Sequence, residues 1–217
     1  FKAFEQAPQL PISVIAENSV KINLTENSEP ITRTEAVPNE WMKINDYGIG
    51  MFIQNDNVMA IKAFKRVSEL EPSRVDGYRN VARVLIREGK LDEAYKWLEK
   101  SLALKKDDPQ TLWVLGLAKQ KEGEYEDAIV AYSKVIKAFP EDRKVLNNLG
   151  RVHFLLENYE EAIDYFNRVL DIDPEDLMSH YHLMQIYAEL DEEQKMAKHE
   201  SAYQYYRKDD NAKALSR

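Results

Sequence analysis

Apolar residues between positions 75 and 104 form two stripes, each with the spacing of one face of an α-helix. The first stripe follows an i, i+3, i+4, i+7 pattern and consists of Tyr78, Val81, Ala82 and Leu85. Gly89 then interrupts the pattern, because glycine suits the backbone of a helix end. A second stripe begins after it, with Leu91, Ala94 and Leu98. The segment is therefore predicted to form two helices joined by a tight turn.

Both stripes recur along the chain with a period of 34 residues. In the second helix of each pair, a small residue recurs as Ala60, Ala94, Ala128 and Ala162. Four residues later, on the same helical face, a bulky residue recurs as Phe64, Leu98, Tyr132 and Phe166. The first helices carry Gly48, Ala82, Gly116, Gly150 and Met184 at the same period. Small residues beside bulky ones are expected where identical helix pairs stack closely, so the pattern predicts a helical repeat protein.

The repeated residues resemble those of the tetratricopeptide repeat family. The family's large-small pair in the first helix is matched by Tyr47-Gly48, Val81-Ala82, Leu115-Gly116 and Leu149-Gly150. Prolines that close a unit are matched by Pro72, Pro140 and Pro174, whereas Lys106 stands at that position in the second unit. The resemblance covers about residues 41–190. It implies an all-α fold, a right-handed superhelical solenoid of antiparallel helix pairs.

The period predicts a repeat array over residues 41–190, with units near 41–74, 75–108, 109–142, 143–176 and 177–208. The fifth unit departs from the pattern, since Met196 and Glu200 replace the alanine and the aromatic residue of its second helix. A terminal unit has no successor to cover it and is expected to have a more polar outer face. Residues 192–217 are therefore predicted to form a capping helix and a tail.

The turn inside each pair needs a residue that tolerates left-handed backbone geometry. Asn55, Gly89 and Gly123 occupy this position in the first three units. Glu157 occupies it in the fourth unit and does not suit that geometry. The fourth turn is therefore expected to differ slightly from the others.

Residues 1–40 differ in kind from the repeats and are expected to form a short extended segment followed by a linker. Apolar residues alternate with others, as in short strands, at Ile12, Val14, Val20, Ile22 and Leu24. The polar stretch 27–39 contains two prolines, which favours a linker. The segment is either a cap on the first unit or the edge of an upstream domain. As a cap, it would cover the apolar residues Ile49, Phe52 and Ile53.

Charge and composition narrow the chemistry of the chain. Acidic residues number 38 and basic residues 30, giving a net charge of −8, so nucleic acid is disfavoured as a partner. The absence of cysteine excludes thiolate metal sites, cysteine nucleophiles and covalently attached c-type haem within these residues. No histidine pair has the i, i+4 spacing of a helical metal site, and no nucleophile or phosphate-loop motif occurs. We expect no catalytic residues, metal site, cofactor, enzymatic activity or membrane insertion.

The family resemblance implies that the first helix of each pair lines the concave side of the solenoid. On the helical wheel, residues opposite the core stripes form a basic, amide-rich surface. Arginines there would bind carboxylates of an acidic partner, Asn80 and Asn148 would pair with peptide main chain, and aromatic residues would anchor side chains. Such residues on a helix are otherwise usual for a solvated face. The predicted groove consists of Arg79, Asn80, Arg83, Trp113, Leu117, Gln120, Lys144, Asn147, Asn148, Arg151, Phe154, Tyr181 and Gln185.

One variant of the family binds carboxylates with a particular set of Lys, Asn and Arg residues across consecutive units. Ile49 and Val114 interrupt that set in this chain. The resemblance therefore does not carry this carboxylate clamp over to the predicted groove.

Three functions fit these observations. The first is a protein-protein interaction scaffold that binds an extended peptide or partner protein in the concave groove. The second is an accessory docking domain of a larger extracytoplasmic multihaem redox protein, because residues 45–50, 77–83 and 180–184 resemble the C-terminal repeat region of bacterial multihaem cytochrome c proteins. The third is a self-assembly module that forms a homo-oligomer. The second resemblance favours a periplasmic location, and a cytoplasmic location is the alternative.

Overall fold

Ten α-helices make up the part of the chain that the computed structural model describes, residues 40–215, with side chains described for residues 40–208. No strand occurs within that part, which confirms the predicted all-α repeat fold. The expected extended segment over residues 1–40 and its contacts lie outside the described residues. The helices are α1 (Glu40–Ile53), α2 (Asn57–Leu70), α3 (Val75–Arg87), α4 (Leu91–Leu104), α5 (Pro109–Glu122), α6 (Tyr125–Ala138), α7 (Arg143–Leu155), α8 (Tyr159–Ile172), α9 (Leu177–Glu189) and α10 (Glu193–Leu215).

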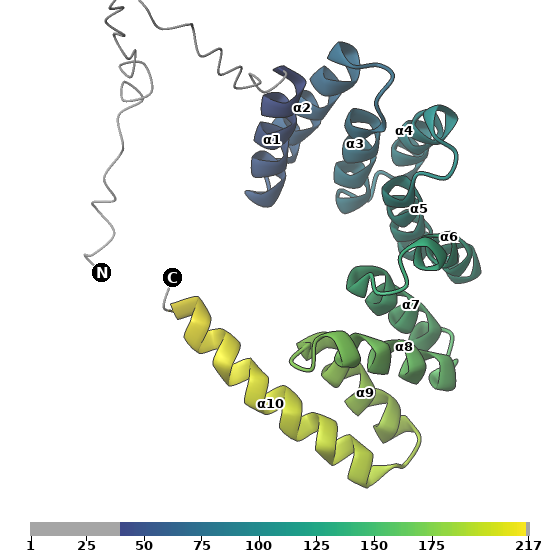
Figure 1. Cartoon of the computed structure of the whole chain (residues 1–217), viewed down its shortest axis with the longest axis vertical. Coiled ribbons are helices and arrows are strands. Elements are labelled where there is room, and N and C mark those ends of the chain that lie inside the picture. Colours follow the sequence, from purple (N-terminus) through teal and green to yellow (C-terminus); the bar gives the residue numbers. More distant parts are fainter. Residues whose placement is uncertain (1–39, 216–217) are drawn as a thin grey trace, which may run out of the picture. The chain divides into compact units, whose positions relative to one another are not determined.

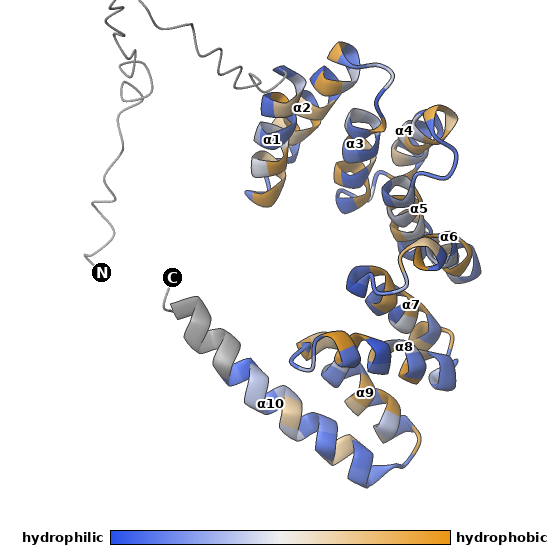
Figure 2. Ribbon diagram, in the orientation of Figure 1, coloured by the Kyte–Doolittle hydropathy of each residue, from blue (hydrophilic) through white to orange (hydrophobic). Residues whose placement is uncertain are grey.

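Consecutive helices pack as antiparallel pairs, and the pairs follow one another in a curved row (Figure 1). The first helices of the pairs, α1, α3, α5 and α7, lie on the inner side of this row, and their partners lie on the outer side (Figure 1). Hydrophobic residues recur in every helix from α1 to α9, whereas the coloured part of α10 is largely hydrophilic (Figure 2). None of the described helices is long and apolar enough to span a membrane.

The small and bulky residues that recur every 34 positions meet inside each pair. Tyr132 and Phe166 are fully buried in the second helices of their pairs. A Cβ atom added to Gly150 would lie 2.8 Å from the ring of Phe166, and one added to Gly48 would lie 2.7 Å from Phe64. The glycines are therefore required because an aromatic ring from the partner helix occupies the space of a side chain.

The turns inside the five pairs share one backbone conformation. Residues with positive φ recur at intervals of 34, and they are Asn55 (62°), Gly89 (78°), Gly123 (91°), Glu157 (59°) and Asp191 (55°). In each turn the next amide donates to a carbonyl five residues earlier, as Asn158 N does to His153 O at 2.9 Å. The expectation of a different fourth turn was therefore wrong, because the hydrogen bonds of the helix end hold Glu157 in the left-handed region despite its Cβ.

Basic side chains of one unit cap the inner helix of the unit before it. The Nη1 of Arg87 donates to the carbonyl of Phe52 at 2.6 Å, and the Nζ of Lys121 donates to the carbonyl of Ile86 at 2.7 Å. Each cation reaches back 35 residues and satisfies a carbonyl at the end of a helix, where positive charge is also favourable. Leu155 stands at this position in the fourth unit, so the tie is not repeated there.

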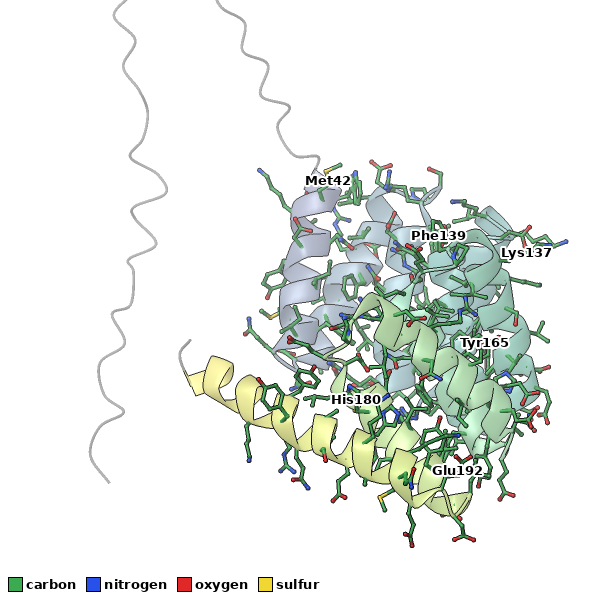
Figure 3. All side chains as sticks on the ribbon, turned by 60° about the horizontal axis from the view of Figure 1, so that its bottom comes forward. Met42, Lys137, Phe139, Tyr165, His180 and Glu192 are labelled. Atoms are coloured by element: carbon green, nitrogen blue, oxygen red, sulfur yellow. The ribbon has the colours of Figure 1, made fainter. Side chains whose placement is uncertain are left out.

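The last helix is held to α9 by a histidine pair. His180 is labelled in Figure 3. Its Nδ1 lies 3.0 Å from the Nδ1 of His199, and its Nε2 lies 3.0 Å from the carbonyl oxygen of Pro174. Because a carbonyl only accepts, His180 donates through Nε2 and His199 donates its Nδ1 proton to His180. Burial lowers the pKa of His199 to about 4, and the charges of His180 and Lys198 contribute in the same direction.

Candidate functional site

A cleft of about 760 Å³ opens on the inner side of the array. It is lined by residues of α1, α3, α5 and α7, by Val135 of α6, and by residues of the connections that precede α3, α5 and α7. Five of the predicted groove residues line this cleft, namely Arg79, Asn80, Arg83, Trp113 and Lys144. The other eight do not line it, and they are Leu117, Gln120, Asn147, Asn148, Arg151, Phe154, Tyr181 and Gln185.

The cleft carries more positive than negative charge, although the chain as a whole is acidic. Its basic lining residues are Arg74, Arg79, Arg83, Lys105 and Lys144, and its acidic ones are Asp76, Asp108 and Asp142. Arg74 and Lys105 were missed by the wheel because they lie outside the inner helices, at residues that precede α3 and follow α4. The local excess of positive charge favours a negatively charged ligand.

Arg79 has carboxylate partners within the chain. Its Nη2 lies 2.9 Å from Asp76 Oδ1 and its Nη1 lies 3.6 Å from Asp108 Oδ2. The Arg79 side chain is only 11% exposed. Asp108 also accepts from the backbone amide of Thr111 and thereby caps α5. Arg79 therefore ties the second unit to the third, which corrects the expectation that its guanidinium is available for a ligand carboxylate.

Asn80 is also committed to an internal contact. It is 7% exposed, and its Nδ2 donates to Asn45 Oδ1 of α1 at 2.9 Å. The expectation that Asn80 faces away from packed surfaces was wrong, because the neighbouring inner helix covers this face of α3. Its amide holds two units together and is not displayed as a free donor and acceptor.

Two further predicted residues have partners of this kind. Asn147 accepts from Ser179 Oγ at 3.1 Å, and its Nδ2 lies 3.5 Å from Asp176 Oδ2. Gln120 accepts from the hydroxyl of the buried Tyr132 at 3.0 Å. Asn147 thus contacts the next unit, whereas Gln120 contacts the second helix of its own unit. Wheel positions that face the groove therefore also hold neighbouring helices together.

Arg83 differs from these residues because it has no carboxylate partner within the described part of the chain. Its guanidinium carbon lies 4.7 Å from the ring centre of Phe52 and 5.8 Å from that of Trp113. Partial desolvation lowers the pKa of Arg83, and the charges of Arg79 and Arg87 lower it further. Two aromatic rings thus position a guanidinium whose charge is not compensated.

Trp113 lines the cleft and also packs against the hydrophobic cores of two neighbouring units. The half-buried ring packs against the hydrophobic clusters of both the second and the third units. Its Nε1–H is buried and has no hydrogen-bond partner among the described residues. A buried donor without a partner costs about 1–3 kcal/mol, so a ligand oxygen that reached it would remove an existing penalty.

The C-terminal half of the inner surface is rich in aromatic rings. The ring centres of Phe154 and His182 lie 5.5 Å apart, and those of Tyr181 and Tyr203 of α10 lie 5.7 Å apart. Burial lowers the pKa of His182, against a hydrogen bond from its side chain to Gln185 that raises it. The wheel did not select Tyr203, because its contact with Tyr181 depends on how α9 and α10 cross.

Three basic or amide side chains of α7, in the C-terminal half of the inner surface, make no polar contact with other described residues. Lys144 and Arg151 are exposed, Asn148 is half-buried, and none of the three side chains has an ion-pair or hydrogen-bond partner among the described residues. Leu117 is half-buried between the two halves of the surface. Within the described part of the chain, no group of three or more metal-ligating side chains comes together.

Stacked helix pairs with a shared inner cleft define a solenoid of the helical repeat class. The sequence model of the tetratricopeptide repeat family matches residues 54–109 and residues 114–176, which is more than half of the chain. The chain belongs to the tetratricopeptide repeat family. It is therefore a repeat scaffold of the general class that binds proteins or peptides.

Solved structures show the same fold at low sequence identity. The chain is similar to PilF of Pseudomonas aeruginosa, with a TM-score of 0.71 and 18% identity over 76% of this chain and 76% of that chain. It is also similar to MamA from Desulfovibrio magneticus, with a TM-score of 0.67 and 19% identity over 80% of this chain and 98% of that chain. A search of curated proteins found no match.

Proposed function

We propose that the inner surface of the array binds an extended segment of a partner protein that carries acidic groups. The observation behind the proposal is Arg83, an exposed guanidinium without an internal counter-charge, held between two aromatic rings at the edge of a net positive cleft. Other arginines of the array, such as Arg79 and Arg168, have carboxylates beside them. A carboxylate of the partner would therefore gain the most favourable electrostatic interaction at Arg83.

The chemistry of such a contact is favourable. A guanidinium offers paired N–H donors in a planar fork that matches the two oxygens of a carboxylate. Phe52 and Trp113 restrict the side chain of Arg83 before binding, so less conformational entropy is lost when the ligand arrives.

Neighbouring residues would hold the main chain of the ligand. Gln110 and Asn148 are amides on α5 and α7 without internal hydrogen-bond partners among the described residues, and an amide presents a donor and an acceptor to a peptide group. Lys144 lines the same cleft and would attract acidic side chains next to the one bound at Arg83. The function involves recognition and no chemical step.

The proposal is tested with peptides selected on the chain from a randomised display library and then titrated by calorimetry. Arg83→Gln should weaken binding about tenfold or more, because a hydrogen bond to a charged group contributes about 1.5–3 kcal/mol. Arg66→Gln is the matched control, since Arg66 is an exposed arginine on the outer helix α2. Equal affinities of the two variants for every selected peptide would overturn the proposal.

A further inference from the structure

The residue ninth in each unit follows a regular alternation along the inner surface. These equivalent residues are 34 positions apart, and they are Ile49, Arg83, Leu117, Arg151 and Gln185. They occupy the same place on α1, α3, α5, α7 and α9, the first helices of successive pairs, so they are expected to run across the array as one stripe. An apolar residue thus precedes each of two arginines, and Leu117 separates them.

Both arginines of this stripe are exposed and lack a carboxylate partner among the described residues. Arg151 lies close enough to Tyr132 and His182 for its charge to act on both side chains. Arg143, on the same helix, is instead paired with Asp173. Two guanidiniums at equivalent places, two units apart, therefore remain uncompensated.

Their separation can be gauged from the usual spacing of neighbouring helices, which is about 8–10 Å. At that spacing, two steps along the stripe, from α3 to α5 and from α5 to α7, would cover roughly 16–20 Å. An extended peptide advances about 3.3 Å per residue. The distance from Arg83 to Arg151 therefore corresponds to about five or six residues of an extended ligand.

We infer that the partner segment carries two carboxylates about five or six residues apart, with an apolar side chain between them. One carboxylate would pair with Arg83, the other with Arg151, and the apolar side chain would lie on Leu117. The inference rests on the proposed function and adds a spacing rule to it. It depends on the equivalent placement of the two arginines and not on the cleft alone, since Arg151 lies outside the cleft.

Two such contacts predict how the affinity for the ligand falls when Arg83, Arg151 or both are replaced. Replacing either arginine should weaken a two-carboxylate ligand about tenfold, which corresponds to about 1.4 kcal/mol. Replacing both should weaken it about a hundredfold if the two contacts act independently. A ligand with a single carboxylate should respond to only one of the two substitutions.

The experiment selects binders from a library of random twelve-residue peptides, using four versions of the chain as bait: wild type, Arg83→Gln, Arg151→Gln and the outer-face control Arg66→Gln. Wild type and the control should enrich peptides with two acidic residues five or six positions apart and an apolar residue between them. Each groove variant should lose that spacing preference. Thermal melts of all four proteins establish that the variants are folded.

Two failures can be told apart. Peptides that depend on Arg83 but show no preferred acidic spacing and no response to Arg151→Gln would overturn the inference and leave the proposed function standing. An absence of any enriched peptide that depends on either arginine would overturn both.

Discussion

Asn45 and Asn80 lie on neighbouring inner helices and are joined by an amide-amide hydrogen bond of 2.9 Å. Asn80 is buried and Asn45 is half-buried, so the loss of Asn45 would leave the Asn80 amide without a partner away from water. Single side chains of this kind, together with Arg79 and Asn147, define how one unit is set against the next.

Asn80→Ala should lower the free energy of unfolding by about 1–2 kcal/mol, because it removes the hydrogen bond to Asn45 and the packing of a buried side chain. In a chain that already carries Asn45→Ala, the same substitution should cost less, since no partner is left unsatisfied. Asn148→Ala is the control and should change stability by about 0.5 kcal/mol or less. Urea unfolding of the four variants measures these differences, and equal costs of Asn80→Ala in both backgrounds would contradict the assigned bond.

Glu157 is held with φ of 59° at a position where two other units have glycine. Glu157→Gly should raise the free energy of unfolding by about 0.5–1 kcal/mol, because glycine adopts this geometry without the penalty of a Cβ. Gly123→Ala introduces the penalty at the equivalent turn and should lower stability by about 1 kcal/mol. Thermal or chemical unfolding checks both signs, and a destabilised Glu157→Gly protein would show that the Glu157 side chain contributes more than the strain costs.

At the scale of elements, α10 packs against α9 through several contacts, and one of them, the buried pair of His180 and His199, changes its chemistry with pH. His199 is 7% exposed, and the groups around it are His180 and Tyr187 of α9 and Lys198 of its own helix. The pKa of His199 is depressed from 6.5 to about 4, so the folded chain binds this proton less readily than the unfolded chain. Its contribution to stability is therefore complete above pH 6.5.

As the pH falls from about 6.5 to about 4, this contribution should be lost, up to about 3 kcal/mol. Hydrogen exchange in α10 should accelerate over that range before exchange in α3 to α6 does. His199→Gln removes the titrating group and should flatten the pH dependence of α10. The same acid response in wild type and in His199→Gln would show that another group is responsible.

Helix pairs were predictable from the sequence because the signals for them are local or strictly periodic. Ala128, Tyr132 and Gly116 form a contact within one unit, and the 34-residue period repeats it along the chain. The availability of groove side chains was not predictable in the same way. Arg79 pairs with Asp76 of the same helix and with Asp108 of the connection before α5, and the helical wheel of α3 holds no information about that connection.

At the scale of the whole array, binding depends on which side chains of the inner face have no hydrogen-bond or ion-pair partner within the described residues. Arg79, Asn80, Asn147 and Gln120 have internal partners, whereas Arg83, Lys144 and Arg151 remain for a ligand. We therefore expect a partner to approach the inner helices beside Arg83 and Trp113. An acidic partner also fits the local excess of positive charge in an otherwise acidic chain.

The chain has three tryptophans, and their indole N–H signals in a ¹H–¹⁵N spectrum report on different surfaces. Trp113 lines the cleft, while Trp97 lies on α4 against Lys65 and Lys100 on the outer side. During titration with a selected acidic peptide, the Trp113 signal, assigned with Trp113→Phe, should shift in a saturable manner, and the Trp97 signal should stay in place. A saturable shift of Trp97 with an unchanged Trp113 signal would contradict the account.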